Sequence, residues 1–385
     1  MRIQVQTFKS ILLAAAFFLI VLADLWTPSK YIGTVLMMLA CLEGMASKPL
    51  RKTDVYLAAA VFALWTIGFL FQTLTASQLL LAAAYYVVLI AVAVFGDRAA
   101  SSVRTLVGIA AGFFAGILTV FFCDPSAITE QLNDASNTRM RISGSFNHPN
   151  TLGYSAFAVI FLLLIVLSLR RKTFSRVQKA ACVLMIGTAA VFLYLSKSRG
   201  AWLITAVFLV FYASRALFRL PVRQRWAVSL ILAAVLLIAA LIFVQTYVLA
   251  DASYSSRIKG LFSMDLGDRM LFGYGMVDAD SIDYTVLSEG SMEIAWLKLY
   301  YKNGLVGILT FALLILYSLG KALNIRRLRY RRLWWAVFFA FLANSFAEST
   351  MVAIFNAFPL CLWICLSALP VILREEADAE AVRAA

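Results

Sequence analysis

The feature that most constrains this chain is a succession of apolar runs, most of them near 20 residues long, separated by short polar segments. A helix of roughly 20 apolar residues spans the hydrocarbon core of a bilayer, so each run predicts a transmembrane helix. The composition agrees, because 63% of the residues are hydrophobic and only 14% are charged, whereas a soluble domain is about half apolar. The chain is therefore predicted to be a polytopic membrane protein.

The apolar runs predict the number of spans and the extent of the domain. They lie near residues 8–26, 31–46, 55–71, 78–95, 105–122, 152–169, 180–195, 201–217, 226–249, 299–319, 333–349 and 351–373. The predicted fold class is all-α, with about twelve transmembrane helices, because helices satisfy their own backbone groups in lipid. One transmembrane domain covers 1–374, and 375–385 form a short cytoplasmic tail.

Basic residues indicate the orientation, because positively charged connections are retained in the cytoplasm. With the N-terminus inside, the inside segments hold 24 of the 34 Lys and Arg residues and the outside segments hold 10. Both termini are therefore predicted to be cytoplasmic. The net charge of +14 follows from this topology, so no nucleic-acid partner is predicted.

Two polar connections on the predicted outer face, 123–150 and 250–292, are long. Long loops in compact folds are functional or disordered, so candidate site residues are sought there. The chain has a single histidine and no Gly-rich phosphate loop, and its acidic group at 278–283 lacks the spacing of a calcium loop. The sequence therefore predicts no metal site and no cofactor.

The first long connection ends in a polar cluster just before an apolar run. Arg139 and Arg141 are placed to grip a phosphate, or else to pair with Asp134 and lipid headgroups. Asn150 is predicted to cap the next helix, whose N-terminus favours anionic groups. His148 is expected to have a hydrogen-bonding or structural role in preference to a catalytic one.

A second cluster, Ser198-Arg199-Gly200, lies in a very short outer connection between two apolar runs. An arginine held at the bilayer boundary is costly to dehydrate unless it meets an anion, and its fork of donors suits a phosphate. The alternative is a topological boundary charge, but such charges belong mainly on the inner side. We therefore predict a functional role for Arg199.

The second long connection carries Arg257 and then two glutamates, Glu289 and Glu293, close to the next helix. A carboxylate in this place has a simple explanation as a partner of the helix dipole, and this explanation is strong for Glu289. Glu293 lies one turn further, on the face shared with Leu297 and Tyr300. That position favours a role for Glu293 in a site.

Three separated motifs resemble those of the O-antigen ligase and polymerase superfamily of bacterial envelope glycosyltransferases. A pattern of Arg, Gly, Phe and Pro-Asn before a helix is matched by Arg141, Gly144, Phe146, Pro149 and Asn150. A Ser-Arg-Gly turn is matched by residues 198–200. A Gly-x-Gly that is followed by Gly-Leu-x-Gly is matched by residues 273–275 and 304–307.

The resemblance covers roughly residues 140–308 and departs at one point, because ligases of the family usually carry a His-Asn where this chain has Glu293-Ile294. The chain therefore looks more like the polymerase branch. The resemblance implies a GT-C-like multi-pass enzyme of the bacterial cytoplasmic membrane. Its substrates would be a glycan donor on undecaprenyl diphosphate and a lipid-linked glycan acceptor. Membrane lipids and a chain-length regulator or other assembly enzymes would be further partners.

By this resemblance, the enzyme needs no metal, because fixed guanidinium groups stabilise the charge on the leaving diphosphate. Arg199, together with Arg141 or Arg257, is assigned that role, and Glu293 is the candidate general base. The other candidate substrate-binding residues are Arg139, Asn150, Ser198 and Glu289. Two alternatives stay open, an O-antigen-type ligase and a lipid-linked glycan transporter or flippase.

Overall fold

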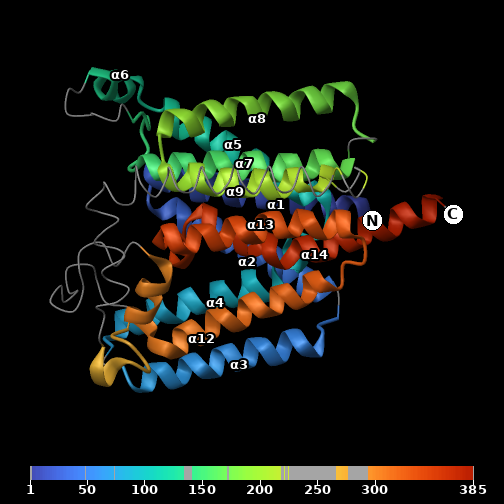
Figure 1. Cartoon of the computed structure of the whole chain (residues 1–385). Coiled ribbons are helices and arrows are strands. Elements are labelled where there is room, and N and C mark those ends of the chain that lie inside the picture. Colours follow the sequence, from blue (N-terminus) through green and yellow to red (C-terminus); the bar gives the residue numbers. More distant parts are fainter. Residues whose placement is uncertain are drawn as a thin grey trace.

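A computed structural model of the protein describes residues 2–47, 49–72, 74–133, 141–170, 173–217, 221, 224, 266–275 and 294–384. Every regular element in these ranges is helical (Figure 1). The α-helices are α1 (Arg2–Val21), α2 (Pro28–Ser47), α3 (Lys52–Leu70), α4 (Ala76–Ala99), α5 (Val103–Phe122), α6 (Pro125–Asn133), α7 (Pro149–Arg170), α8 (Arg176–Ser196), α9 (Arg199–Leu217), α12 (Ala295–Leu323), α13 (Leu328–Ala347) and α14 (Ala357–Ala384). Three 3-10 helices join them, η1 (Leu22–Asp24), η3 (Gly267–Arg269) and η6 (Ser349–Val352).

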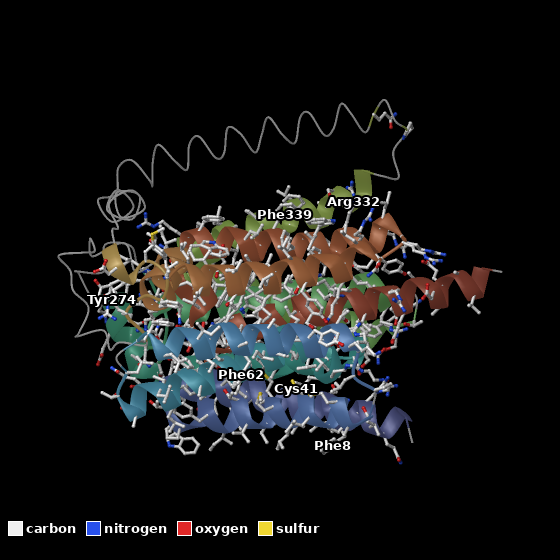
Figure 2. The ribbon with its side chains drawn as sticks, turned by 90° about the horizontal axis from the view of Figure 1, so that it is seen from below. Phe8, Cys41, Phe62, Tyr274, Arg332 and Phe339 are labelled. Atoms are coloured by element: carbon white, nitrogen blue, oxygen red, sulfur yellow. The ribbon has the colours of Figure 1, made fainter. Side chains whose placement is uncertain are left out.

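Eight helices in the described part of the chain are long and apolar enough to cross a membrane. They are α1 with η1, α3, α4, α5, α7, α8, α12 and α14. The protein is thus a bundle of apolar helices of the polytopic membrane type, as the sequence predicts. Large apolar side chains such as Phe8 and Phe62 project from its outer surface (Figure 2), where a soluble protein rarely exposes extended apolar patches.

Four other predicted spans are not among these eight helices. Lys30 and Glu43 make α2 less apolar, and the basic residues at the start of α13 do the same there. The apolar part of α9, Arg199–Ser214, is shorter than the others. The predicted run at 226–249 lies outside the described residues.

The predicted span at 351–373 is wrong at its start. Glu348 is extended after α13, the chain then forms η6, and α14 begins only at Ala357. This start places Pro359 in the first turn of α14, where a helix tolerates proline because the missing N–H would be unpaired anyway. At its other end α14 continues to Ala384 through the predicted tail.

Close backbone approach holds α5 against α1. Gly108, Gly112 and Gly116 recur at four-residue intervals on α5. A Cβ atom at Gly108 or Gly112 would lie 2.3 Å from a backbone oxygen of α1, and one at Gly116 would lie 2.7 Å from Val21 Cβ. Small residues at such intervals let transmembrane helices pack closely, which dispersion forces then stabilise.

The bundle has two distinct ends. Both termini lie at one end, here called the terminal end, whereas α6 and η3 lie at the opposite loop end (Figure 1). Tyr274 lies at the loop end and Arg332 toward the terminal end (Figure 2). Most of α14 and α7 is buried in the middle of the bundle. The segments that carry the three motifs lie toward the loop end (Figure 1).

Candidate functional site

Arg141 joins the first two motifs. Its Nε donates to the carbonyl oxygen of Ser196 at 3.2 Å, and its Nη2 donates to Asn150 Oδ1 at 2.6 Å. The amide of Ile142 also donates to the Leu195 carbonyl at 3.0 Å. Arg141 therefore connects the start of α7 with the end of α8, where Ser196 lies 55 positions after Arg141 in the chain.

The connection between α8 and α9 places Arg199 at the edge of this cluster. α8 ends at Ser196, Lys197 has a left-handed backbone with φ of 42°, and α9 begins at Arg199. Ser198 is fully buried, and its Oγ accepts from the Ala201 amide at 3.3 Å. Ser198, a predicted substrate-binding residue, thus caps α9 in the structure. Arg199 is half-buried on the first turn of that helix.

Glu348 adds a carboxylate that the motifs did not indicate. Asn150 Nδ2 donates to Glu348 Oε1 at 3.4 Å. A Cβ atom at Gly200 would lie 3.2 Å from the same oxygen and 2.2 Å from the Tyr154 hydroxyl. The glycine of the Ser-Arg-Gly turn therefore leaves room for Glu348. The sequence signal for Glu348 is an acidic residue at the end of an apolar run.

We call Arg141, Asn150, Arg199 and Glu348 the arginine site. It contains two guanidinium groups and one carboxylate from α7, α9 and the segments beside α7 and α13. Its positive balance, with Arg141 and Arg199 both half-buried, suits an anionic ligand because charge-assisted hydrogen bonds are stronger than neutral ones. The arrangement can therefore bind a phosphate-bearing group and still offer a carboxylate beside it.

His148 has a structural position at the entrance to α7. Its Nδ1 accepts from the Asn150 amide at 3.1 Å, and its carbonyl accepts from the Thr151 amide. Partial desolvation lowers the pKa of His148, and the charge of Arg141 lowers this pKa further. The predicted capping role of Asn150 is wrong, because α7 begins at Pro149, a favoured first residue. His148 takes the capping position, and the side chain of Asn150 is used by Arg141 and Glu348.

The third motif is a contact between two backbones. α12 is interrupted at Gly304, where φ is 59° and ψ is −157°, a conformation open essentially to glycine alone. The Tyr274 amide donates to the Tyr301 carbonyl at 2.9 Å, and the Gly275 amide donates to the Lys302 carbonyl at 2.8 Å. A Cβ atom at Gly304 would lie 2.4 Å from the Leu271 carbonyl. The Gly-x-Gly segment is thus fixed to the first part of α12.

The remaining predicted site residues are not placed. Arg139, Arg257, Glu289 and Glu293 lie outside the described residues. Arg141, Asn150, Ser198 and Arg199 are described, and they lie together. Among the residues that are described, no three His, Cys, Asp or Glu side chains are grouped so as to hold a metal ion.

Comparisons with known proteins add no relative. No family model matches the chain, and no curated protein matches it significantly.

Proposed function

We propose that this protein is a membrane glycosyltransferase of O-antigen, capsule or exopolysaccharide assembly that polymerises undecaprenyl-diphosphate-linked repeat units. The observation that carries the proposal is the hydrogen bond from Arg141 to the turn that precedes Arg199. Two motifs that resemble those of envelope glycosyltransferases are far apart in sequence, yet the Arg141 side chain contacts the connection that carries Arg199. A pair of guanidinium groups suits a diphosphate leaving group.

In the proposed reaction, the bond between the anomeric carbon of the donor glycan and the diphosphate oxygen breaks. Undecaprenyl diphosphate leaves with the bonding electron pair, and Arg199 and Arg141 stabilise its negative charge. The hydroxyl of the acceptor sugar attacks the anomeric carbon and loses its proton to Glu293, the proposed general base. The reaction requires no redox partner and no metal.

Glu348 is proposed as a positioning residue. Its Oε1 accepts from Asn150, and Asn150 in turn accepts from Arg141. This chain of contacts fixes the direction of the Arg141 guanidinium before a substrate binds. Positioned groups contribute to catalysis because they need little reorganisation during the reaction.

The proposed enzyme has about twelve transmembrane helices in a GT-C-like arrangement, with both termini in the cytoplasm. The eight apolar helices support this arrangement, and the outside position of the loop end follows from the distribution of basic residues. The reaction would then take place on the outer face of the bacterial cytoplasmic membrane. The acceptor is a second lipid-linked glycan.

The test is the glycan chain length in cells that carry the wild type, Arg199→Ala or Glu293→Gln at matched protein levels. A polysaccharide gel should show long chains for the wild type and single repeats for both variants. Arg176→Ala removes an exposed arginine at the start of α8 and should leave the long chains in place. Unchanged chain length in both site variants would refute the catalytic assignment.

The same gel separates the two alternatives. Long chains that are no longer attached to their final acceptor would indicate a ligase. Lipid-linked glycan that accumulates on the cytoplasmic side would indicate a transporter or flippase. Either result would replace polymerisation as the activity of this protein.

A further inference from the structure

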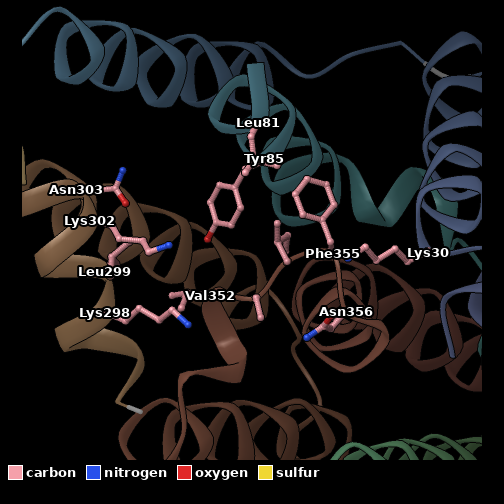
Figure 3. A pocket seen from close by; sticks show the side chains of 12 residues that line it. Lys30, Leu81, Tyr85, Lys298, Leu299, Lys302, Asn303, Val352, Phe355 and Asn356 are labelled. Atoms are coloured by element: carbon pink, nitrogen blue, oxygen red, sulfur yellow. The ribbon is translucent and has the colours of Figure 1, made fainter. Parts of the chain in front are cut away.

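A second polar site lies at the loop end, in a cavity of about 260 Å³ between α2, α4, α12 and the segment after η6 (Figure 3). Three lysines line it, Lys30 at the start of α2 and Lys298 and Lys302 on the first part of α12. Tyr85 and Asn356 add a hydroxyl and an amide. We call this cavity the lysine pocket.

The charges of the lysine pocket have one sign. None of the described residues that line it is acidic, and neither Lys30 nor Lys298 makes an ion pair within the described part of the chain. Lys298 and Lys302 are four positions apart on one helix, so their side chains lie on the same face. In Figure 3 their ammonium groups and the Tyr85 hydroxyl point toward the same space. An anion in that space would accept hydrogen bonds from donors on both helices.

The first part of α12 is held in place by contacts on its backbone and at its break. The Lys302 carbonyl accepts from the Gly275 amide at 2.8 Å and from Gln72 Nε2 at 3.2 Å. Asn303 Nδ2 donates to the Tyr86 hydroxyl, next to Tyr85. The Gly-x-Gly contact therefore positions the lysine backbone, and the pocket is built before any ligand binds. A preformed site avoids the free-energy cost of ordering these side chains.

The rest of the lining defines the kind of ligand. Leu81, Val352 and Phe355 give the cavity apolar walls, and it lies at the ends of apolar helices. Its volume is just below the roughly 300–1,000 Å³ of typical small-molecule pockets, so it fits a headgroup better than an oligosaccharide. Lysine is a common phosphate-binding residue. We propose that the lysine pocket binds a phosphate or diphosphate group.

One segment connects the lysine pocket with the arginine site. Glu348 belongs to the arginine site, and residues 352–356 line the lysine pocket. The loop end thus has two anion sites on either side of η6. If the proposed polymerase function holds, and only then, the second site would receive the diphosphate of the lipid-linked acceptor, while the arginine site holds that of the donor.

The binding test uses the purified full chain in detergent and native mass spectrometry, with three probes titrated separately. The probes are undecaprenyl diphosphate, phosphatidylglycerol and inorganic pyrophosphate. Wild type should bind two copies of undecaprenyl diphosphate, and the double variant Lys298→Gln with Lys302→Gln should bind one. Lys298→Gln alone should weaken the second binding event about tenfold, as expected for one charged hydrogen bond. Lys298→Arg should retain it.

Control variants make the outcome specific. Lys52→Gln removes an exposed lysine of the terminal end and should still bind two copies, whereas Arg199→Gln should lose the other copy. The lysine variants could instead keep both copies of undecaprenyl diphosphate and lose another probe. Loss of pyrophosphate would keep the site and make its ligand a free phosphate, and loss of phosphatidylglycerol would make its ligand an ordinary phospholipid. Lysine variants that bind all three probes as wild type does would overturn the proposal. Since no glycan transfer is measured, the result is independent of the chain-length test.

Discussion

Charged side chains are gathered at both ends of the bundle, but they are arranged in opposite ways. At the terminal end Arg51 pairs with Asp97 at 2.7 Å, and Arg98 lies 3.6 Å from Asp54, which is fully buried. Lys321 lies 3.6 Å from Asp97 as well. Cations and anions alternate there, so each of these five charged residues has a partner within the protein.

At the loop end the cations outnumber the acids that the structure describes. The lysine pocket has three cations and no acid among its described lining residues, and the arginine site has two guanidinium groups with one carboxylate. Burial of charge alone therefore does not identify a site. Paired charges compensate one another within the bundle, whereas an excess of cations around a cavity favours an anionic ligand.

The largest expected effect comes from the terminal end. Asp54→Ala removes a partner of Arg98, which is itself buried, and leaves an uncompensated charge. We expect the free energy of unfolding to fall by about 3–5 kcal/mol, measured by denaturant titration in mixed micelles. A loss of less than about 1 kcal/mol, as for an exposed ion pair, would remove the contrast between the two ends.

The next largest effect is expected at the break in α12. Gly304→Ala forces a side chain into a left-handed conformation and against the Leu271 carbonyl. The free energy of unfolding should fall by about 1–3 kcal/mol, and the lysine pocket should lose affinity for its phosphate probe. Gly187→Ala is the matched control, because a Cβ at Gly187 on α8 meets nothing within 4 Å. Equal effects of the two substitutions would argue against the backbone contact.

A smaller effect is expected for Glu348→Gln. The substitution keeps the shape of the side chain but removes the charge that accepts from Asn150. The glutamine carbonyl still accepts from Asn150, so the loss is less than the about 1.5–3 kcal/mol of a whole charged hydrogen bond. We expect repeat addition to slow about tenfold, with substrate affinity nearly unchanged. Glu375→Gln, in an exposed turn of α14, should leave the rate unaltered. A complete loss of activity would instead give Glu348 a catalytic role.

The smallest effect concerns the titration of His148, the sole histidine, which gives one signal in a histidine-labelled NMR sample. Its pKa should lie below the ordinary value, and Arg141→Gln should raise this pKa because a positive charge is removed. In the wild type, the pKa of His148 is lower in the folded protein than in the unfolded chain, so the unfolded chain binds the proton more readily. The free energy of unfolding therefore decreases as the pH falls below about 6.5. If the pKa of His148 does not change in Arg141→Gln, the charge of Arg141 does not act on His148.

The sequence predicts much of this molecule because membrane spans depend on local composition. Runs of apolar residues indicate α3, α4 and α5 to within about a turn, whereas α1 begins at Arg2, six residues before the predicted span. The motifs indicate Arg141 and Arg199. The start of α14 is not predicted, since the apolar run continues through η6.

The composition of the two sites depends on contacts between distant segments, which local patterns do not contain. Glu348 meets Asn150 across 198 positions, and no motif marks it. Lys30, Lys298 and Lys302 look in the sequence like boundary charges, and only the packing of α2 against the helices around α12 shows that they share a cavity.

The paired charges of the terminal end also constrain the order of biogenesis. Arg51, Asp54, Asp97 and Arg98 all belong to α3, α4 or the residue before α3, so this hairpin neutralises much of its own charge soon after synthesis. Lys321, whose ammonium donates to the Val94 carbonyl, is synthesised 227 positions later. In ribosome-bound chains that stop before α12, Asp97 would therefore pair with Arg51 but not with Lys321. The later helix α12 would then pack against a hairpin that had already entered the bilayer.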